Sequence, residues 1–381
     1  MTLTEADQPK KEKEEWKKQL SGMVKTVDQL RSYIDVTPKE VSDIEEAKAK
    51  KLTWGTTPYY ASLMDRNDPN CPIRKQIVPC FTEEGTKYER ENYLYWKENR
   101  GTDGQGGPFD DDGRPASIAR QYNDRIAFTV LDTCPVYCQF CFRIEATQHK
   151  QKELRFARHV EAGFEWIAEH TEIRDVLITG GDPLTLSDKK IEDIVTRLRA
   201  IPHVEIIRFG SRVPVALPQR ITPSLMKILG GFHRVPIWVN THFNHPAEIT
   251  EASARAVYDL LSCGVQVGNQ AVLLKGVNDD EKVFIDLHKK LLTIRVRPYY
   301  LFYCEAAPGA GRFMTTVERG AELIEALRGH TTGLAQPMYV LATKIGKINL
   351  GPSSSIIAQD EDSYTLRNHR GETINIPVIP T

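Results

Sequence analysis

The sequence contains no hydrophobic run that could span a membrane, since nowhere do about 18 or more apolar residues follow one another. Its start, rich in Lys and Glu from 10 to 18, lacks the apolar core of a secretory signal. Nor does one charge prevail, because 50 Lys and Arg residues balance 51 Asp and Glu residues, for a net charge of −1. No basic field therefore indicates a nucleic-acid partner. We expect a cytoplasmic protein with no membrane and no nucleic-acid partner, acting on a small molecule.

Cysteine is also scarce, with seven residues in a chain of 381. Their odd number and their clustering argue against a disulfide scaffold and for a reducing compartment. Cys134, Cys138 and Cys141 are spaced as C-x3-C-x2-C, whereas the next cysteine is Cys263. Three thiolates can hold three irons of a [4Fe–4S] cluster and leave the fourth iron open to a small molecule. The alternatives are a zinc site or unpaired buried thiols.

From about residue 120 onward, short apolar runs alternate with stretches of helical periodicity such as 191–198 and 253–261. Repeated strand and helix units of this kind predict an α/β fold with a parallel sheet. In barrels built from such units the active site lies at the C-terminal ends of the strands. The cysteine motif and several polar segments fall at those ends. The expected strands are 126–131, 176–179, 204–209, 237–241, 265–274 and 298–304.

The first 50 residues are charged and carry apolar residues at helical intervals, including Trp16, Leu20 and Leu30. We expect this arm to pack on a neighbouring subunit of a homo-oligomer, and a mere charged tail is the alternative. The next stretch is rich in turn signals. Four regions are expected: a helical N-terminal arm, a region packing on the barrel, the barrel, and a C-terminal segment. Their boundaries are 1–53, 54–120, 121–330 and 331–381.

Five further stretches, in the same order, resemble the lysine 2,3-aminomutase family of radical S-adenosylmethionine (SAM) enzymes, and the resemblance runs from about Trp54 to Pro377. The cysteine spacing alone is typical of radical SAM enzymes in general. The resemblance implies a partial (β/α)6 radical SAM barrel with a helical N-terminal arm and a small C-terminal β extension. It also implies a [4Fe–4S] cluster, SAM and pyridoxal 5′-phosphate (PLP) as cofactors. The five stretches are 179–183, 210–221, 240–250, 268–279 and 295–300.

The resemblance assigns a SAM site to polar residues at the strand ends. SAM would bind the open iron, and its reduction would release a 5′-deoxyadenosyl radical that must be kept from water. Glycines allow a backbone to approach a ligand closely. The alternative for the polar residues is that they are satisfied by the backbone. The residues that the family pattern places beside SAM are Thr179, Gly180, Gly181, Asp182, His242 and Gln270.

The resemblance also implies that PLP is bound as an imine to a lysine after the last barrel strand. Lys347, in the pattern Gly-Lys-x4-Pro, matches that lysine, and Lys344 competes with it because the family's run of glycines is shortened here. A lysine nucleophile needs a lowered pKa, which burial or a neighbouring cation provides. Arg125 and Tyr122 match residues near PLP. The alternative is that both lysines lie on the surface of a β-hairpin.

Three positions bear on the substrate. Arg143 matches the family arginine that pairs with the substrate carboxylate, a task that suits a planar guanidinium. Lysine-specific members hold the distal ammonium with two aspartates, and the matching positions here are Glu305 and Ala342. One acid is lengthened and the other is absent, which leaves space for a longer cation. We therefore expect L-arginine rather than L-lysine as the substrate. Glutamate is disfavoured, because Glu305 would present an acid to its distal carboxylate.

Together these residues predict an isomerase, a radical SAM 2,3-aminomutase that moves the α-amino group of a basic L-amino acid to C3 and yields a β-amino acid. A reductase such as flavodoxin or ferredoxin would supply the electron. The alternatives are a PLP-free epimerase or dehydrogenase on the same scaffold, and an iron–sulfur protein without enzymatic activity. The first alternative is favoured if neither Lys344 nor Lys347 binds PLP.

Overall fold

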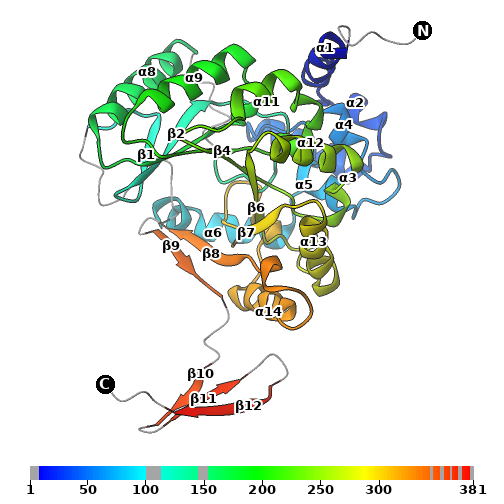
Figure 1. Cartoon of the computed structure of the whole chain (residues 1–381). Coiled ribbons are helices and arrows are strands. Elements are labelled where there is room, and N and C mark those ends of the chain that lie inside the picture. The colour runs from blue at the N-terminus through cyan, green and yellow to red at the C-terminus, as the bar shows by residue number, and fades with distance from the viewer. Residues whose placement is uncertain are drawn as a thin grey trace.

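The structure, a computed structural model, describes residues 8–99, 113–144, 153–343, 346–351, 356–360, 363–367 and 371–377. Its centre is a nine-stranded sheet in the order β1 to β9, which curls into a partial barrel with helices on its outer side (Figure 1). All strands from β2 to β8 run parallel, and the edge strands β1 and β9 are antiparallel to their neighbours. The strands are β1 Ile118–Arg120, β2 Arg125–Leu131, β3 Asp175–Gly180, β4 Ile206–Gly210, β5 Ile237–Thr241, β6 Gln266–Val272, β7 Arg297–Phe302, β8 Met338–Thr343 and β9 Gly346–Asn349.

The α/β partial barrel and the six predicted parallel strands are confirmed, as β2 to β7. The structure adds a strand that the sequence assigned to the C-terminal segment, because β8 pairs parallel with β7 through Tyr300 and Met338. The barrel sheet therefore continues beyond the expected boundary at 330. A separate antiparallel sheet stands apart from the barrel at the C-terminal end (Figure 1). Its strands are β10 Ile356–Gln359, β11 Ser363–Arg367 and β12 Thr373–Pro377.

Several helices on the outside of the sheet begin where a side chain accepts a hydrogen bond from a backbone amide of the first turn, as Ser187 and Thr250 do. Their apolar faces cover the outward side chains of the strands, and on β2 the buried positions alternate with partly exposed ones that face the barrel interior. The helices are α8 Glu153–Glu169, α9 Asp188–Ala200, α10 Val213–Ala216, α11 Pro223–Leu229, α12 Glu251–Ser262, α13 Glu281–Thr293 and α14 Val317–Leu327, with 3-10 turns η1 Pro183–Thr185, η2 Pro218–Arg220, η3 Pro246–Glu248, η4 Gly311–Phe313 and η5 Gly333–Ala335.

The N-terminal region forms a helical layer against the barrel. The turn-rich interpretation of 54–120 was incomplete, because the described part of this stretch holds three helices, of which α6 spans seventeen residues. The contacts of the N-terminal layer with the barrel include a hydrogen bond of 2.6 Å from the Thr57 hydroxyl to the carbonyl of Ala216. The helices of this layer are α1 Gln8–Ser21, α2 Val27–Arg31, α3 Pro38–Ala49, α4 Pro58–Ala61, α5 Pro72–Ile77 and α6 Glu83–Asn99.

The expectation that the N-terminal arm packs on a neighbouring subunit needs correction. Trp16 and Leu30 are buried within the same chain and belong to the main hydrophobic core. The Arg220 guanidinium of η2 lies 4.6 Å from the centre of the Trp16 ring. Helical periodicity shows that one face of a segment is apolar, but it does not identify the surface that covers this face. Here the barrel of the same chain covers it.

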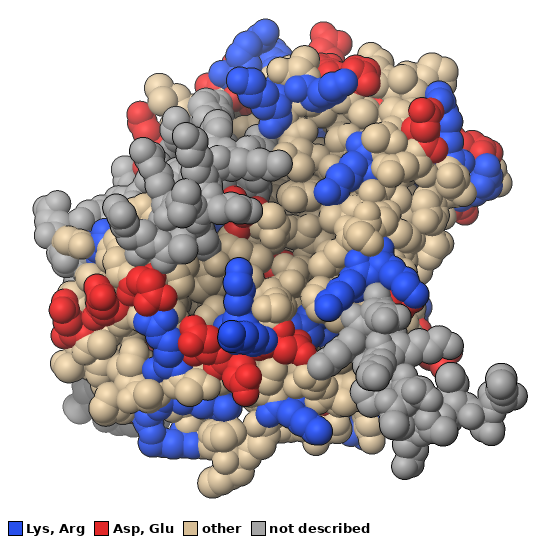
Figure 2. Space-filling view, turned by 90° about the horizontal axis from the view of Figure 1, so that it is seen from above, with Lys and Arg blue, Asp and Glu red and all other residues tan. Residues whose placement is uncertain are grey.

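The surface carries both signs of charge. On the face shown in Figure 2, Lys and Arg side chains lie among Asp and Glu side chains. Within the described ranges, no helix combines the length and the apolar character needed to cross a bilayer.

Candidate functional site

A cavity of about 990 Å³ occupies the interior of the curled sheet. This volume lies at the upper end of the range for small-molecule pockets, so the cavity has room for more than one small ligand. Its walls include residues from both ends of the barrel strands and from the loops that follow them. Apart from Lys344, which lies outside the described residues, the candidate site residues of the sequence analysis line this cavity, namely Tyr122, Arg125, Cys134, Cys138, Cys141, Arg143, Thr179, Gly180, Gly181, Asp182, His242, Gln270, Glu305 and Lys347.

The cysteine loop follows β2 and is tied to the N-terminal layer by its backbone. The amide of Tyr137 donates to the carbonyl of Gly55, and the amide of Gln139 donates to the carbonyl of Gln76, each at 2.9 Å. Burial raises the pKa of the Cys134 thiol, since a thiolate there would lack water. A bound iron–sulfur cluster would provide the positive charge that buried thiolates require. The donor set and its burial therefore fit such a cluster.

Gly180 and Gly181 allow the end of β3 to approach the start of the cysteine loop. A Cβ atom at Gly180 would lie 2.1 Å from the carbonyl oxygen of Leu131, and one at Gly181 would lie 2.1 Å from that of Thr133. Gly180 also has φ +116°, which favours glycine. The amide of Gly181 donates to the Leu131 carbonyl at 2.8 Å. The sequence analysis expected these glycines to admit a ligand, and the structure adds that they admit the backbone that carries the cysteines.

Asp182 lines the cavity, but its carboxylate is engaged by the protein. It accepts hydrogen bonds from the Ser211 hydroxyl at 2.6 Å, from the Arg212 amide at 2.7 Å and from the Leu184 amide at 3.2 Å. Burial raises its pKa to about 6 in spite of these bonds, which act to lower it. Asp182 therefore links the loop after β3 to the loop after β4 and fixes the position of one relative to the other.

Arg143 reaches from the end of the cysteine loop to the end of β3. Its Nη1 donates to the Thr179 hydroxyl at 2.5 Å. Its guanidinium also lies 4.7 Å from the centre of the Phe142 ring. The guanidinium of Arg143 is thus held at the cavity wall, and Thr179 helps to orient it.

His242 follows β5, and its buried Nε2 atom has no hydrogen-bond partner among the residues that the structure describes. Burial, with a further contribution from the Arg212 cation, lowers its pKa to about 3. The imidazole is therefore neutral at physiological pH. A buried polar atom without a partner is costly, and since His242 lines the cavity, a ligand there can supply the missing hydrogen bond. Gln270, on the neighbouring strand β6, lines the same cavity.

The predicted PLP lysine lies on the edge strand β9. Its backbone amide donates to the Tyr122 hydroxyl at 2.9 Å. Lys347 is an exposed residue overall, but its Nζ lies 5.3 Å from the centre of the Tyr122 ring and 5.9 Å from that of Tyr300. Burial of this ammonium group lowers the pKa of Lys347, and the cations of Arg208 and Arg125 lower it further. Lys344 lies outside the described residues.

Ala342 lies directly across the hairpin from Lys347, because β8 and β9 pair these two residues. Glu305 follows β7 on the same cavity wall. The loop that carries it is held by α6, where the Glu89 carboxylate accepts hydrogen bonds from the amides of Gly311 at 2.7 Å and Gly309 at 3.2 Å.

Besides Glu305, two acids stand among the described lining residues of the cavity. Asp175 pairs with Arg208 at 2.7 Å, and Asp182 accepts the three hydrogen bonds described above. Glu305 is the third acid among the described lining residues.

Sequence reasoning missed Arg212, whose Nη1 lies 2.7 Å from the Sγ of Cys138. The family-like stretch 210–221 contains this arginine, and its place directly after a predicted strand was the available signal. Its partners could not be identified that way, since Gln76 and Tyr60 precede it by 136 and 152 residues.

Comparisons with known proteins agree with this geometry. A model described as "Radical SAM superfamily" matches residues 128–288, and one described as "Lysine-2,3-aminomutase" matches residues 324–377. The chain is 41% identical to the L-lysine 2,3-aminomutase of Clostridium subterminale over 360 residues, which covers 94% of this chain and 82% of that protein. It is 40% identical to the L-lysine 2,3-aminomutase of Bacillus subtilis over 374 residues, covering 97% and 76%.

The chain is also similar to the glutamate 2,3-aminomutase of Clostridioides difficile, with 38% identity over 373 residues, covering 95% of this chain and 83% of that protein. Among solved structures, a radical SAM methyltransferase from Sphaerobacter thermophilus aligns with a TM-score of 0.40 and 17% identity, covering 58% of this chain and 68% of that one.

Proposed function

This chain belongs to the lysine 2,3-aminomutase family of radical SAM enzymes, and on that premise we propose that it moves the α-amino group of a basic L-amino acid, preferably L-arginine, to C3. The family membership makes the chain an amino-acid aminomutase that uses a [4Fe–4S] cluster and SAM. The identity of the substrate, the use of PLP and the roles of individual residues are the proposal. One observation carries it: Arg143, Lys347 and Glu305 line a single cavity.

The cofactors are assigned to residues that line different parts of the cavity. The three cysteines hold the cluster, and Lys347 is the attachment residue of PLP, with Arg125 and Tyr122 beside it. When bound, the cluster and SAM supply hydrogen-atom abstraction, and PLP supplies a carrier for the migrating amino group. The chain itself lowers the pKa of Lys347, which eases the loss of its proton. The residues proposed to surround SAM are Thr179, Gly180, Gly181, Asp182, His242 and Gln270.

The two ends of the substrate would be held by opposite charges. Arg143 offers a planar guanidinium, oriented by Thr179, to the α-carboxylate. Glu305 offers a carboxylate to the distal cation, and two oxygens suit the fork of a guanidinium. The small side chain of Ala342, opposite Lys347, leaves space beside the reacting lysine. These features support arginine over lysine, and they oppose glutamate, whose distal carboxylate would meet Glu305.

L-lysine is the second candidate substrate, because the relatives from Clostridium subterminale and Bacillus subtilis bear the name of lysine 2,3-aminomutase. A PLP-free radical SAM reaction on the same scaffold is a separate alternative. The lowered pKa of Lys347 supports PLP attachment, since only the neutral amine attacks a carbonyl carbon. A one-electron reductase such as flavodoxin or ferredoxin is the proposed electron donor.

The test of this proposal is the ratio of kcat/KM for L-arginine and L-lysine, measured with reduced enzyme, SAM and PLP, with products identified by mass spectrometry. We expect arginine to be preferred in the wild type. Glu305→Gln should lower kcat/KM for both cations at least about tenfold, because removing one charge of a buried pair costs about 2 kcal/mol or more. Ala342→Asp should shift the preference toward lysine.

Glu322→Gln is the matched control, since Glu322 is an exposed acid that pairs with Arg319 on α14. A wild type that prefers lysine, or a Glu305→Gln variant that behaves like Glu322→Gln, would show that Glu305 does not select the substrate. Turnover without bound PLP would favour the PLP-free alternative.

A further inference from the structure

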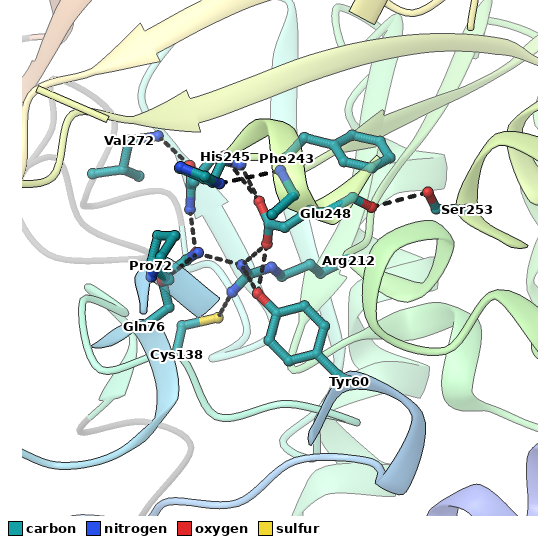
Figure 3. Close-up of polar contacts among 12 residues, drawn as sticks. Tyr60, Pro72, Gln76, Cys138, Arg212, Phe243, His245, Glu248, Ser253 and Val272 are labelled. Carbon is teal, nitrogen blue, oxygen red and sulfur yellow. Dashed lines mark hydrogen bonds and ion pairs between the residues drawn. The ribbon is translucent and has the colours of Figure 1, made fainter. Parts of the chain in front are cut away.

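One cysteine of the proposed cluster site is contacted by a buried cation. Arg212 lies between β4 and α10, and its residue is 6% exposed. Its Nη1 donates to the Sγ of Cys138 at 2.7 Å, as Figure 3 shows. The guanidinium also lies 5.6 Å from the centre of the Phe140 ring, which belongs to the same loop. A thiolate sulfur that binds iron can still accept such a hydrogen bond.

The other side of the Arg212 guanidinium is held through its Nη2 atom by three partners (Figure 3), whereas its buried Nε has no hydrogen-bond partner among the described residues. Its Nη2 lies 2.5 Å from the Gln76 side-chain oxygen, 2.6 Å from Glu248 Oε1 and 2.9 Å from the Tyr60 hydroxyl. Gln76, Tyr60 and Glu248 are each 0% exposed. The position of the cation is therefore determined by α4, α5 and η3 together.

Glu248 is itself bonded on both oxygens. The Tyr60 hydroxyl donates to Oε1 at 2.5 Å, while the amides of Asn244 and His245 donate to Oε2 at 2.5 and 2.8 Å. A buried ion pair of this kind is weak evidence for stability, because an apolar replacement is often as stable. The network therefore needs an explanation beyond packing, and its contact with a cysteine sulfur provides one.

We propose that Arg212 is a positioning residue that sets the reduction potential of the cluster held by Cys134, Cys138 and Cys141. When one electron from an external reductant enters the cluster, the cluster gains one negative charge and no bond is broken. Hydrogen bonds to the sulfurs and the local net charge govern the potential of such clusters. Arg212 stabilises the reduced form through Cys138, and Glu248 limits this effect by neutralising the cation. This inference rests on the proposed role of the three cysteines.

The two members of the pair should shift the potential in opposite directions. Arg212→Gln removes the positive charge, so the reduced cluster becomes less stable. Glu248→Gln keeps the shape but leaves the Arg212 cation without its counter-charge, so the reduced cluster becomes more stable. A purely structural role would not produce opposite signs. Arg212→Lys keeps the charge but loses the fork that joins Cys138 to Glu248, so its shift should be smaller than that of Arg212→Gln.

A second buried ion pair, which lies in the N-terminal layer, offers a matched control. Arg74 is 1% exposed, and its Nε and Nη2 contact the two oxygens of Glu40 at 2.6 and 2.5 Å. Its further partners are the backbone carbonyls of Asp35 and Arg66. Arg74→Lys therefore disturbs a buried ion pair of the same region without changing the charge beside Cys138.

The experiment is a redox titration of the full-length protein, with its cluster reconstituted anaerobically and the reduced cluster quantified by electron paramagnetic resonance. At a fixed solution potential, Arg212→Gln should lower the ratio of reduced to oxidised cluster about tenfold, which equals about 59 mV for a one-electron couple. Glu248→Gln should raise this ratio, and Arg74→Lys should leave it unchanged. Iron content is measured on each sample.

Unchanged potentials in iron-replete Arg212 and Glu248 variants, or shifts of the same sign in both, would overturn the inference. If Arg212→Gln does not fold, Arg212→Lys and Glu248→Gln carry the test, and their shifts must still have opposite signs. A wild type that binds no iron after reconstitution would overturn the proposed cysteine site together with this inference. A wild type that binds iron but makes no β-amino acid would leave the potentials to decide the inference alone.

Discussion

The two ends of the cavity are built in different ways. At the cysteine end, the loop is tied to the N-terminal layer through Gly55 and Gln76, and it is contacted by the buried cation Arg212. At the lysine end, Lys347 lies on an edge strand, and the Tyr122 hydroxyl bonds to its backbone. The first end is held by many buried contacts from distant parts of the chain. The second is held, among the described residues, chiefly by contacts of an edge strand with the segment around Tyr122.

Because of this difference, we expect substitutions at the two ends of the cavity to affect reactivity and stability differently. Substitutions at the lysine end should alter reactivity while the fold persists, since few buried contacts are lost there. Substitutions at the cysteine end should alter cofactor binding and, where they reach the network around Arg212, the stability of the layer as well. The following predictions test that contrast.

The largest effect is expected from Cys138→Ala. Removing one of three thiolates should reduce cluster content and SAM cleavage to background, because no other cysteine lies close in the sequence. The barrel should remain folded by circular dichroism, although loss of the hydrogen bond from Arg212 to the Cys138 sulfur should lower the stability of the N-terminal layer. Iron content and the release of 5′-deoxyadenosine are the measurements. Full iron content with normal SAM cleavage would remove Cys138 from the site, and Cys263→Ala provides the control.

Lys347→Ala should abolish aminomutase activity while cluster content stays normal. The residue is exposed apart from its ammonium group, so the free energy of unfolding should change by no more than about 0.5 kcal/mol. Borohydride reduction of the wild type in the presence of PLP, followed by peptide mapping, should place the label on Lys347.

A label on Lys344 in that experiment would show that the alignment of this segment is shifted by three residues. No label on either lysine would favour a PLP-free reaction. Lys275→Ala, at an exposed lysine that pairs with Glu84, serves as the control for labelling.

Glu89→Gln should have an intermediate effect, because it acts on the loop that carries Glu305 rather than on the chemistry. The substitution removes the charge that accepts hydrogen bonds from the amides of Gly309 and Gly311. Hydrogen bonds to a charged group contribute about 1.5–3 kcal/mol. We expect KM for the amino acid to rise several-fold with kcat less affected, as steady-state kinetics will show. Glu84 is an exposed acid on the same helix. If Glu84→Gln changes KM and kcat as much as Glu89→Gln does, then Glu89 has no specific role in holding the loop.

The smallest effect is expected from His242→Gln, and it concerns acid stability. Burial lowers the pKa of His242 to about 3 in the folded protein, whereas an unfolded histidine titrates near 6.5. Between these two values the unfolded state binds the extra proton, so the free energy of unfolding falls as the pH decreases from about 6.5 to about 3, by up to about 1.4 kcal/mol per pH unit.

His242→Gln should remove part of this slope, measured by urea denaturation of the cluster-free protein at several pH values. The lysine end should respond at the opposite extreme. Because its pKa is lowered, Lys347 disfavours the folded state while it is charged, and this cost disappears as the pH rises toward the ordinary value of 10.5. An unchanged acid slope in His242→Gln would mean that other groups govern acid stability at the cysteine end.

The residues that line the cavity were predicted more completely than the helices around the barrel. The cysteine triad was identified from its spacing, the glycines of β3 and Lys347 were assigned through the family resemblance, and all of them line one cavity. The helix α6 was not identified, because turn-forming residues dominate the segments on either side of it. The docking of Trp16 on η2 was assigned to a neighbouring subunit, since an amphipathic pattern does not name its partner.

What the sequence by itself determined is the set of elements and reactive groups whose signals are local, namely six parallel strands and the cysteine spacing, to which the family resemblance added the Gly-Lys segment. Only the tertiary structure decided which distant residues surround these groups. Arg212, Tyr60 and Glu248 carry no pattern that links them, yet the fold brings them together, because a buried charge is tolerated only where an opposite charge and polar groups lie beside it. Such satisfaction is a property of three-dimensional packing, and no local stretch of sequence encodes it.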